Sequence, residues 1–362
     1  MKALYTALLA PLALLAMTGF VSCGGDSSSD TRHSPSGYGG DETRGTEKSA
    51  IGVFVPGVVD GSPTYEMLVR GVRRAVADFP GASATVVEGG FNQAGWLEGV
   101  MSMAASGRYD LIVTSNPSMP EIILEVAQAV PGVRFLLMDA YLPDHEGVHS
   151  ILFNQREQAY LSGYFAGLLT TSDLPGATAR PRIGLLAGQE FPIMNEVILP
   201  GYREGARQIS EEITLDFRVL GNWFDAGKAQ EIAADMIRSG SDTILTIAGG
   251  GNQGALSAAR ERGTYVLWYD DSGYDEGPGV VAGSSLVHQD TMTYQATKEA
   301  LRGETPWGSA RILGVADGAV GFDTEHPAFR ELIPSEMIQA MEAKLELLRQ
   351  GELRLEMTPP GT

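Results

Sequence analysis

From residue 51 onward, the sequence alternates short apolar runs with longer amphipathic segments. An apolar run of this kind suits a buried strand, and the longer segments repeat their apolar residues at helical spacing. Strands that alternate with helices are typical of parallel sheets in which crossover helices join successive strands. The alternation occurs in two series, so we expect an α/β protein with two parallel-sheet lobes joined by a hinge.

The apolar runs predict four strands in each series, with helices in the intervals. In the first interval Met67, Leu68 and Val72 share one helical face. A helix over 156–169 separates the two series. The predicted strands are 51–55, 84–88, 111–114, 135–138, 183–187, 216–220, 243–247 and 265–268, followed by a helix over 289–301, a strand over 311–315 and a helix over 335–349.

The first residues have the pattern of an export signal. Lys2 supplies one positive charge, and an almost unbroken apolar run follows as far as Phe20. The run is short for a membrane span and contains Pro11. We expect residues 1–22 to be a signal peptide and the thiol of Cys23 to be acylated after cleavage. The alternative is an uncleaved anchor that ends in a chance cysteine.

Composition narrows the class of protein further. Cys23 is the only cysteine in 362 residues, which excludes a disulfide framework and a cysteine-based metal site. The formal net charge is −19, from 26 basic and 45 acidic residues without a basic run, so nucleic-acid binding is disfavoured. Residues 23–50 are rich in Ser, Gly, Asp and Thr and predict a disordered spacer. We therefore expect a monomeric domain that is lipid-anchored in the cell envelope and faces the periplasm.

The chain of a two-lobed binding protein crosses between its lobes more than once. We therefore expect the helix near 289–303 to return to the first lobe. The predicted lobes are 51–153 plus 288–305 and 154–287 plus 306–362.

Polar and aromatic residues collect directly after the predicted strands. Ligands of open parallel sheets bind beyond the carboxyl ends of the strands. Aromatic faces stack on flat rings, and carboxylates accept hydrogen bonds from hydroxyls, which suits a flat, hydroxylated ligand. Tyr65 and Trp223 can instead pack, and Asp139 and Asp270 can be turn residues. The candidate ligand-binding residues are Ser62, Thr64, Tyr65, Asn116, Asp139, Tyr141, Trp223, Gly249, Gly250 and Asp270.

A glycine pattern in the second series suggests a different class of protein. Gly249, Gly251 and Gly254 follow a predicted strand, and Asp270 lies 21 residues after Gly249, which is the spacing of a dinucleotide-binding fingerprint. Its position in the second lobe and the export signal disfavour a dinucleotide-dependent enzyme. No Walker loop, zinc motif or nucleophile elbow is present in the sequence, so we expect neither catalysis nor a bound metal.

Four segments and two aspartates together have the pattern of a known family. The segments are 154–163, 221–225, 248–254 and 315–321, and the aspartates are Asp139 and Asp270, each after an apolar run. From about residue 51 on, the chain resembles the basic membrane protein (PnrA-like) family of ABC-transporter substrate-binding lipoproteins. The resemblance implies a type I periplasmic-binding fold, no enzymatic activity, no cofactor, and a permease and an ATPase as partners.

The resemblance also implies roles for single residues. In the nucleoside receptors of the family, two aromatic rings hold the base and an aspartate binds the ribose. Trp223 matches one of these rings, Asp139 an aspartate at the base, and Asp270 the ribose aspartate. His288 stands where the family has a lysine near the sugar.

One loop departs from the family. Where the family has Asp-x-Ser-Phe-Asn, residues 60–64 read Asp-Gly-Ser-Pro-Thr, and Tyr65 follows. The segment 61–68 is similar to that of spirochaetal riboflavin-binding lipoproteins. We therefore expect riboflavin as the transported ligand, with a purine nucleoside as the alternative within the family and a dinucleotide- or nucleoside-acting enzyme as the alternative from another class.

Overall fold

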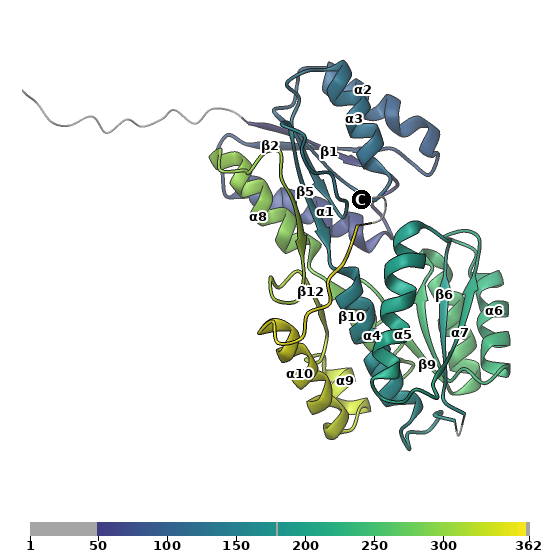
Figure 1. The fold of residues 1–362 in the computed structure, drawn as a ribbon. Helices are drawn as coiled ribbons and strands as arrows, with labels where there is room; N and C mark the ends of the chain where they lie inside the picture. The colour runs from purple at the N-terminus through teal and green to yellow at the C-terminus, as the bar shows by residue number, and fades with distance from the viewer. Residues whose placement is uncertain (1–48, 179, 360–362) are drawn as a thin grey trace, which may run out of the picture. The chain divides into compact units, whose positions relative to one another are not determined.

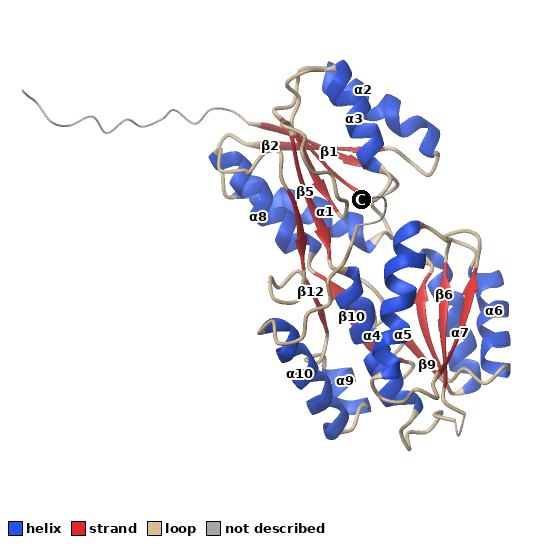
Figure 2. Cartoon of the chain, in the orientation of Figure 1, coloured by secondary structure: helices blue, strands red, loops and turns tan. Residues whose placement is uncertain are grey.

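A computed structural model describes residues 49–178 and 180–359, which form two six-stranded sheets flanked by helices (Figure 1 and Figure 2). The predicted signal peptide, Cys23 and nearly all of the predicted spacer lie outside the described residues. Within the described ranges, no helix has the length and apolar character that a membrane crossing requires.

The first sheet has the strand order β11-β5-β4-β3-β1-β2, and all its pairs are parallel. Alternate residues of β1 point to opposite faces, so Val53 and Val55 pack with Leu68 of α1, whereas Phe54 packs with Trp96 of α2. The strands are β1 (Ala50–Val55), β2 (Ser83–Glu88), β3 (Leu111–Ser115), β4 (Phe135–Met138), β5 (Val148–Phe153) and β11 (Ala310–Leu313), and the helices are α1 (Pro63–Ala77), α2 (Trp96–Ala105), α3 (Met119–Ala129) and α8 (Gln289–Arg302).

The second sheet has the order β12-β10-β9-β8-β6-β7, and its edge strand β12 is antiparallel to β10. On one face of this sheet, Leu186 and Ile244 pack with Ala233 and Met236 of α6. Buried residues of α4 and α5 belong to a larger hydrophobic core that also includes residues of the first sheet. The strands are β6 (Arg182–Ala187), β7 (Thr214–Val219), β8 (Thr243–Ile247), β9 (Tyr265–Trp268), β10 (Val281–Val287) and β12 (Val320–Phe322), and the helices are α4 (Gln155–Thr170), α5 (Leu199–Arg207), α6 (Ala226–Arg238), α7 (Asn252–Arg262), α9 (Pro327–Leu332) and α10 (Ser335–Arg349).

The two sheets confirm the predicted α/β class, and the eight predicted strands are all present. Strands β5, β10 and β12 were not predicted. Each of the first two leads directly into a helix that packs with the other lobe. Strand β5 carries His149 and Ser150, and β10 carries Ser284 and Ser285, all of them buried. These polar residues interrupt the apolar pattern from which buried strands were predicted.

Strand β11 corrects the predicted lobe boundary. Residues 306–362 were assigned to the second lobe, but β11 pairs in parallel with β5 from Ala310 opposite Ser150 to Leu313 opposite Phe153. The chain therefore completes the first sheet before β12 joins the second. Helix α8 packs on α1, where Arg70 contacts Asp290 at 3.1 Å.

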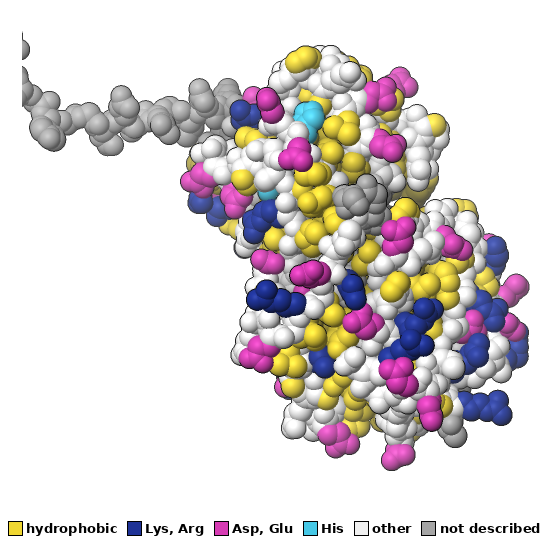
Figure 3. Space-filling view, viewed as in Figure 1, with side chains coloured by type: hydrophobic (Ala, Val, Ile, Leu, Met, Phe, Trp, Pro, Cys, Tyr) yellow, Lys and Arg dark blue, Asp and Glu magenta, His cyan; other side chains and the backbone are white. Residues whose placement is uncertain are grey.

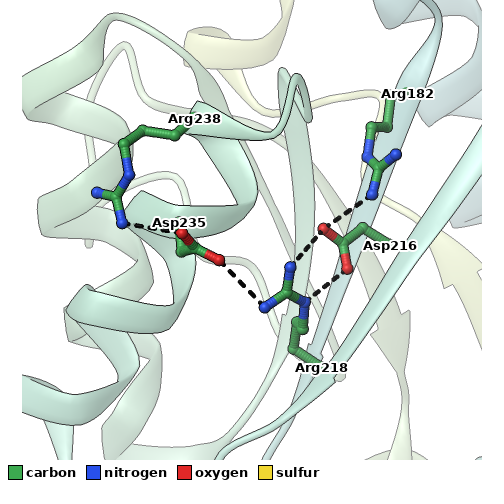
Figure 4. Close-up of polar contacts among 5 residues, drawn as sticks. All are labelled: Arg182, Asp216, Arg218, Asp235 and Arg238. Atoms are coloured by element: carbon green, nitrogen blue, oxygen red, sulfur yellow. Dashed lines mark hydrogen bonds and ion pairs between the residues drawn. The ribbon is translucent and has the colours of Figure 1, made fainter.

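An ion-pair network ties β6, β7 and α6 together at the second sheet (Figure 4). Asp216 is buried and accepts hydrogen bonds from Arg218 at 2.7 Å, with Arg182 3.2 Å away. Burial alone would raise the pKa of Asp216, but the two guanidinium groups hold it below its ordinary value. Arg218 also contacts Asp235, which pairs with Arg238 on the same helix. Basic and acidic side chains are likewise interspersed on the face drawn in Figure 3.

Candidate functional site

Two aspartates, one from each sheet, are hydrogen-bonded to the first turn of α4. Asp139 directly follows β4, and its Oδ1 accepts a hydrogen bond from Gln155 Nε2 at 3.0 Å. Asp270 lies just beyond β9, and its Oδ1 accepts from Gln158 Nε2, also at 3.0 Å. Residues three apart share one face of a helix. The start of α4 therefore brings together carboxylates from the ends of equivalent strands in the two sheets.

The backbone at these strand ends is strained. Asn116, Asp139 and Asp270 have φ angles of 135°, 50° and 75°, in the left-handed region that favours glycine. A non-glycine residue in such a conformation costs roughly 1–3 kcal/mol, and this kind of strain clusters at functional sites. Three of the four described non-glycine residues with positive φ follow strands β3, β4 and β9, and the fourth, Asp144, lies in the loop after β4. This concentration at strand ends identifies that edge as the candidate binding site.

The two carboxylates repel each other electrostatically. Burial, followed by the charge of Asp270, raises the pKa of Asp139 from 3.8 to about 7. Burial also raises the pKa of Asp270 from 3.8 to about 6, against the hydrogen bond from Gln158 and with the help of Asp271. No Lys or Arg is among the described groups that shift either pKa. The site is therefore suited to a ligand that donates hydrogen bonds and carries no negative charge.

Tyr65 and Asn116 form a second unit of the site. The Tyr65 hydroxyl donates to the carbonyl of Pro56 and accepts from Asn116 Nδ2, both at 3.0 Å. Burial in particular raises the pKa of Tyr65 to about 12, so the phenol is neutral. Asn116 Oδ1 already accepts from the amide of Ser118 at 2.8 Å. Since the polar atoms of this unit are bonded within the protein, the half-buried ring face is the part of Tyr65 suited to a ligand.

Trp223 provides an aromatic surface at the ends of β6 and β7. Its side chain is 39% exposed, and its Nε1 donates to Gln189 Oε1 at 3.1 Å. The indole lies so close to Gly188 that a Cβ there would be 2.5 Å from the ring, and Phe191 lies 6.2 Å from it between centroids. The carbonyl of Trp223 accepts from the amide of Gly250 at 2.9 Å. The indole is thus held in place while part of it stays accessible.

The glycines of the apparent dinucleotide fingerprint have packing roles. A Cβ on Gly254 would lie 2.0 Å from the carbonyl of Ala226, so α6 and α7 can approach only because residue 254 is glycine. A Cβ on Gly251 would lie 2.7 Å from Leu220, and one on Gly249 would lie 2.7 Å from the Trp223 carbonyl. These contacts explain the spacing without a dinucleotide.

The remaining predicted site residues lie at the edges of this arrangement. Ser62 precedes α1, and the carbonyl of Thr64 in its first turn accepts from Gln289 Nε2 at 2.8 Å. Tyr141 is partly buried against the core. His288 directly precedes α8, and its neighbour Val287 donates its amide to the carbonyl of Asp270 at 3.0 Å.

Sequence reasoning missed the glutamines that organise the site. Gln155, Gln158 and Gln289 are each less than 10% exposed, and they lie in the first turns of the two crossover helices α4 and α8. Gln155 and Gln289 occupy equivalent positions, each two residues after the strand that precedes its helix. Buried polar residues at the start of an otherwise apolar helix were the available signal, because such groups need partners. Phe191 was missed because nothing in its local sequence places it beside Trp223.

Two α/β lobes built mainly of parallel strands, with polar and aromatic residues at the strand ends, have the type I periplasmic-binding fold of solute-binding proteins. Residues 48–346 match the family model described as "ABC transporter substrate-binding protein PnrA-like". The chain belongs to this family, whose members are substrate-binding receptors of ABC transporters and not enzymes.

Individual relatives agree with the family assignment. The chain is 24% identical to basic membrane protein A of Borreliella burgdorferi over 77% of this chain and 80% of that protein. It is 29% identical to the ABC transporter nucleoside-binding protein BmpA of Lactococcus lactis, over 42% of this chain and 41% of that one. An ABC transporter solute-binding protein from Aeropyrum pernix superposes with a TM-score of 0.75 at 22% identity, over 86% of this chain and 94% of that chain.

Proposed function

We propose that this ABC-transporter substrate-binding protein binds riboflavin between its two lobes and delivers it to a permease. The observation that carries the proposal is the pair of carboxylates, Asp139 and Asp270, one from each lobe, for which the described residues provide no cationic partner. A ligand that donates hydrogen bonds to both carboxylates binds the closed arrangement of the lobes more tightly than the open one, and so stabilises the closed arrangement. The imide N–H of a flavin ring and the hydroxyls of its polyol chain provide such donors.

The charge of the site favours an unphosphorylated ligand. A phosphate would bring negative charge toward two carboxylates, and like charges that are removed from water repel strongly. Riboflavin and nucleosides carry no phosphate and therefore suit the site, whereas the corresponding nucleotides do not.

The aromatic residues favour a flavin over a nucleoside. Tyr65 and Trp223 are proposed to hold the ring between them, and Trp223 has a larger surface than the phenylalanine of the family. The resemblance of the segment 61–68 to riboflavin-binding lipoproteins points the same way. A purine nucleoside is the second candidate, favoured by the match to the nucleoside-binding relative of Lactococcus lactis.

We expect riboflavin to quench the tryptophan fluorescence of the ligand-free protein saturably, and protein purified from its natural host to be yellow. Trp223→Ala is expected to weaken riboflavin binding by about 1–3 kcal/mol, because one stacking face is lost. Calorimetry with riboflavin, flavin mononucleotide, inosine and guanosine provides the measurement, and the mononucleotide is expected to bind more weakly than riboflavin. If calorimetry showed binding of inosine or guanosine but no binding of riboflavin, the ligand would be a nucleoside and the flavin proposal would be wrong.

We further propose that Cys23 carries lipid and anchors the protein in the cell envelope. Several acyl chains on one residue hold a protein durably at a membrane. Labelling of cells with a fatty-acid probe is expected to mark the protein, and Cys23→Ser is expected to abolish the label. Ser22→Ala is the control, because it alters the neighbouring residue and keeps the thiol. Undiminished labelling of Cys23→Ser would refute the anchor.

A further inference from the structure

We infer that Gln155 and Gln158 are positioning residues that aim one oxygen of Asp139 and one of Asp270 at the ligand, and so select ligands that donate a hydrogen bond to each lobe. This role rests on the proposed function for the identity of the ligand. The hydrogen bonds that orient the carboxylates can be tested in the ligand-free protein.

The geometry of the pair supports this role. Gln155 is 8% exposed and Gln158 is 0% exposed, so water has little access to either amide. Each glutamine donates Nε2 to the Oδ1 atom of its aspartate. Among the hydrogen bonds of the described residues, the Oδ2 atom of each aspartate has no protein donor. Each carboxylate is thus held by one oxygen and keeps the other as an acceptor.

The chemistry of the amide is part of the argument. An arginine at either position would also hold a carboxylate, but it would neutralise the charge and occupy both oxygens. A glutamine fixes the orientation through one bond and leaves the negative charge for the ligand. The site therefore favours a donor on both sides, and a ligand with acceptors at these positions would leave a desolvated carboxylate unpaired.

The first turn of α4 is itself held firmly. Asn154 caps the helix by accepting from the amide of Glu157 at 3.2 Å, and its Nδ2 donates to the carbonyl of Leu355 at 3.0 Å. Glu157 accepts from the amide of Val315 at 2.7 Å, in the segment that leads from β11 to β12. The turn that carries both glutamines is therefore hydrogen-bonded to the segment that crosses from β11 to β12. These bonds hold the glutamine side chains in a fixed position relative to the site.

Methionine replacements test the role, because methionine keeps the length of glutamine and removes its donor. Gln289→Met is the matched control: Gln289 is 1% exposed at the equivalent start of α8, but it donates to a backbone carbonyl. The readout is the pKa of each aspartate, measured by carboxyl NMR in the ligand-free protein. Asp271 also raises the pKa of Asp270, and the two aspartates in turn raise the pKa values of Tyr65 and Tyr269.

Gln155→Met is expected to raise the pKa of Asp139, and Gln158→Met that of Asp270, each by about 1 to 2, because a hydrogen bond to the ionised form is lost. Gln289→Met is expected to move neither. The pH midpoint of ligand affinity should rise with the pKa in the first two variants, an effect that loss of packing alone does not produce.

Unchanged aspartate pKa values, or equal changes in Gln289→Met, would overturn the inference. A wild-type protein that binds neither riboflavin nor a nucleoside would overturn the proposed ligand instead, and the NMR titration would still decide the role of the glutamines.

Discussion

Asp139→Asn is expected to stabilise the ligand-free protein at pH 8 by about 1–3 kcal/mol and to weaken ligand binding roughly 10- to 100-fold. The gain arises because the substitution removes a partly buried charge that Asp270 repels. Asparagine keeps an oxygen that can accept from Gln155. The loss of affinity arises because a charge-assisted hydrogen bond to the ligand becomes a neutral one. Asp270→Asn should act in the same direction.

The same groups determine how the stability of the wild-type protein depends on pH. Both folded-state pKa values, about 7 for Asp139 and about 6 for Asp270, lie above the ordinary value of 3.8. Between about pH 4 and 7 the native state binds more protons than the unfolded state, so the free energy of unfolding falls as pH rises. When the folded and unfolded pKa values of a group differ by about 1, the free energy of unfolding changes by about 1.4 kcal/mol. The destabilisation is complete above about pH 7.

Urea unfolding at pH 5 and pH 8 measures both effects. Wild type is expected to lose stability between these values, and the loss should shrink in each Asp→Asn variant. Asp173→Asn is the control, because Asp173 lies far along the chain from both aspartates, in the turn between α4 and β6. If Asp139→Asn and Asp270→Asn showed the same change in stability between pH 5 and pH 8 as wild type, this account of the site would be wrong.

Gly163→Ala is expected to destabilise the protein by at least about 3 kcal/mol. A Cβ on Gly163 of α4 would lie 1.9 Å from the carbonyl oxygen of Tyr202 in α5, and one on Gly205 would lie 2.0 Å from the carbonyl of Tyr160. Both tyrosines are fully buried, so the helices must separate within the core. Movement of α4 would also displace Gln155, and we expect ligand affinity to fall with stability.

Gly227→Ala in α6 is the matched control for this prediction. Its Cβ would have no neighbour closer than 3.6 Å, and alanine favours a helix by up to about 1 kcal/mol over glycine. Urea unfolding should therefore show a loss for Gly163→Ala and no loss for Gly227→Ala. Equal stabilities of the two variants would mean that α4 and α5 do not pack as closely as described.

Local pattern was sufficient to place most of the regular structure. The predicted bounds of β4, β8 and β9 agree with the structure to the residue, because these central strands are largely buried and mostly apolar. The bounds predicted for the last helix also agree with α10, which buries Met337, Met341, Leu345 and Leu348 on its apolar face. The loops after these strands could be identified as the candidate site because the carboxyl ends of parallel strands share one edge.

Long-range pairing determined the rest. Strands β5 and β10 carry polar residues among their apolar ones, and these polar residues are buried because neighbouring strands pair with each strand on both sides. The partners at the site are separated by 16 residues for Asp139 and Gln155 and by 112 for Asp270 and Gln158. No local sequence pattern predicts these two glutamine–aspartate hydrogen bonds. They form only when α4 crosses from the first sheet to the second and brings Gln155 and Gln158 next to the aspartates of the two lobes.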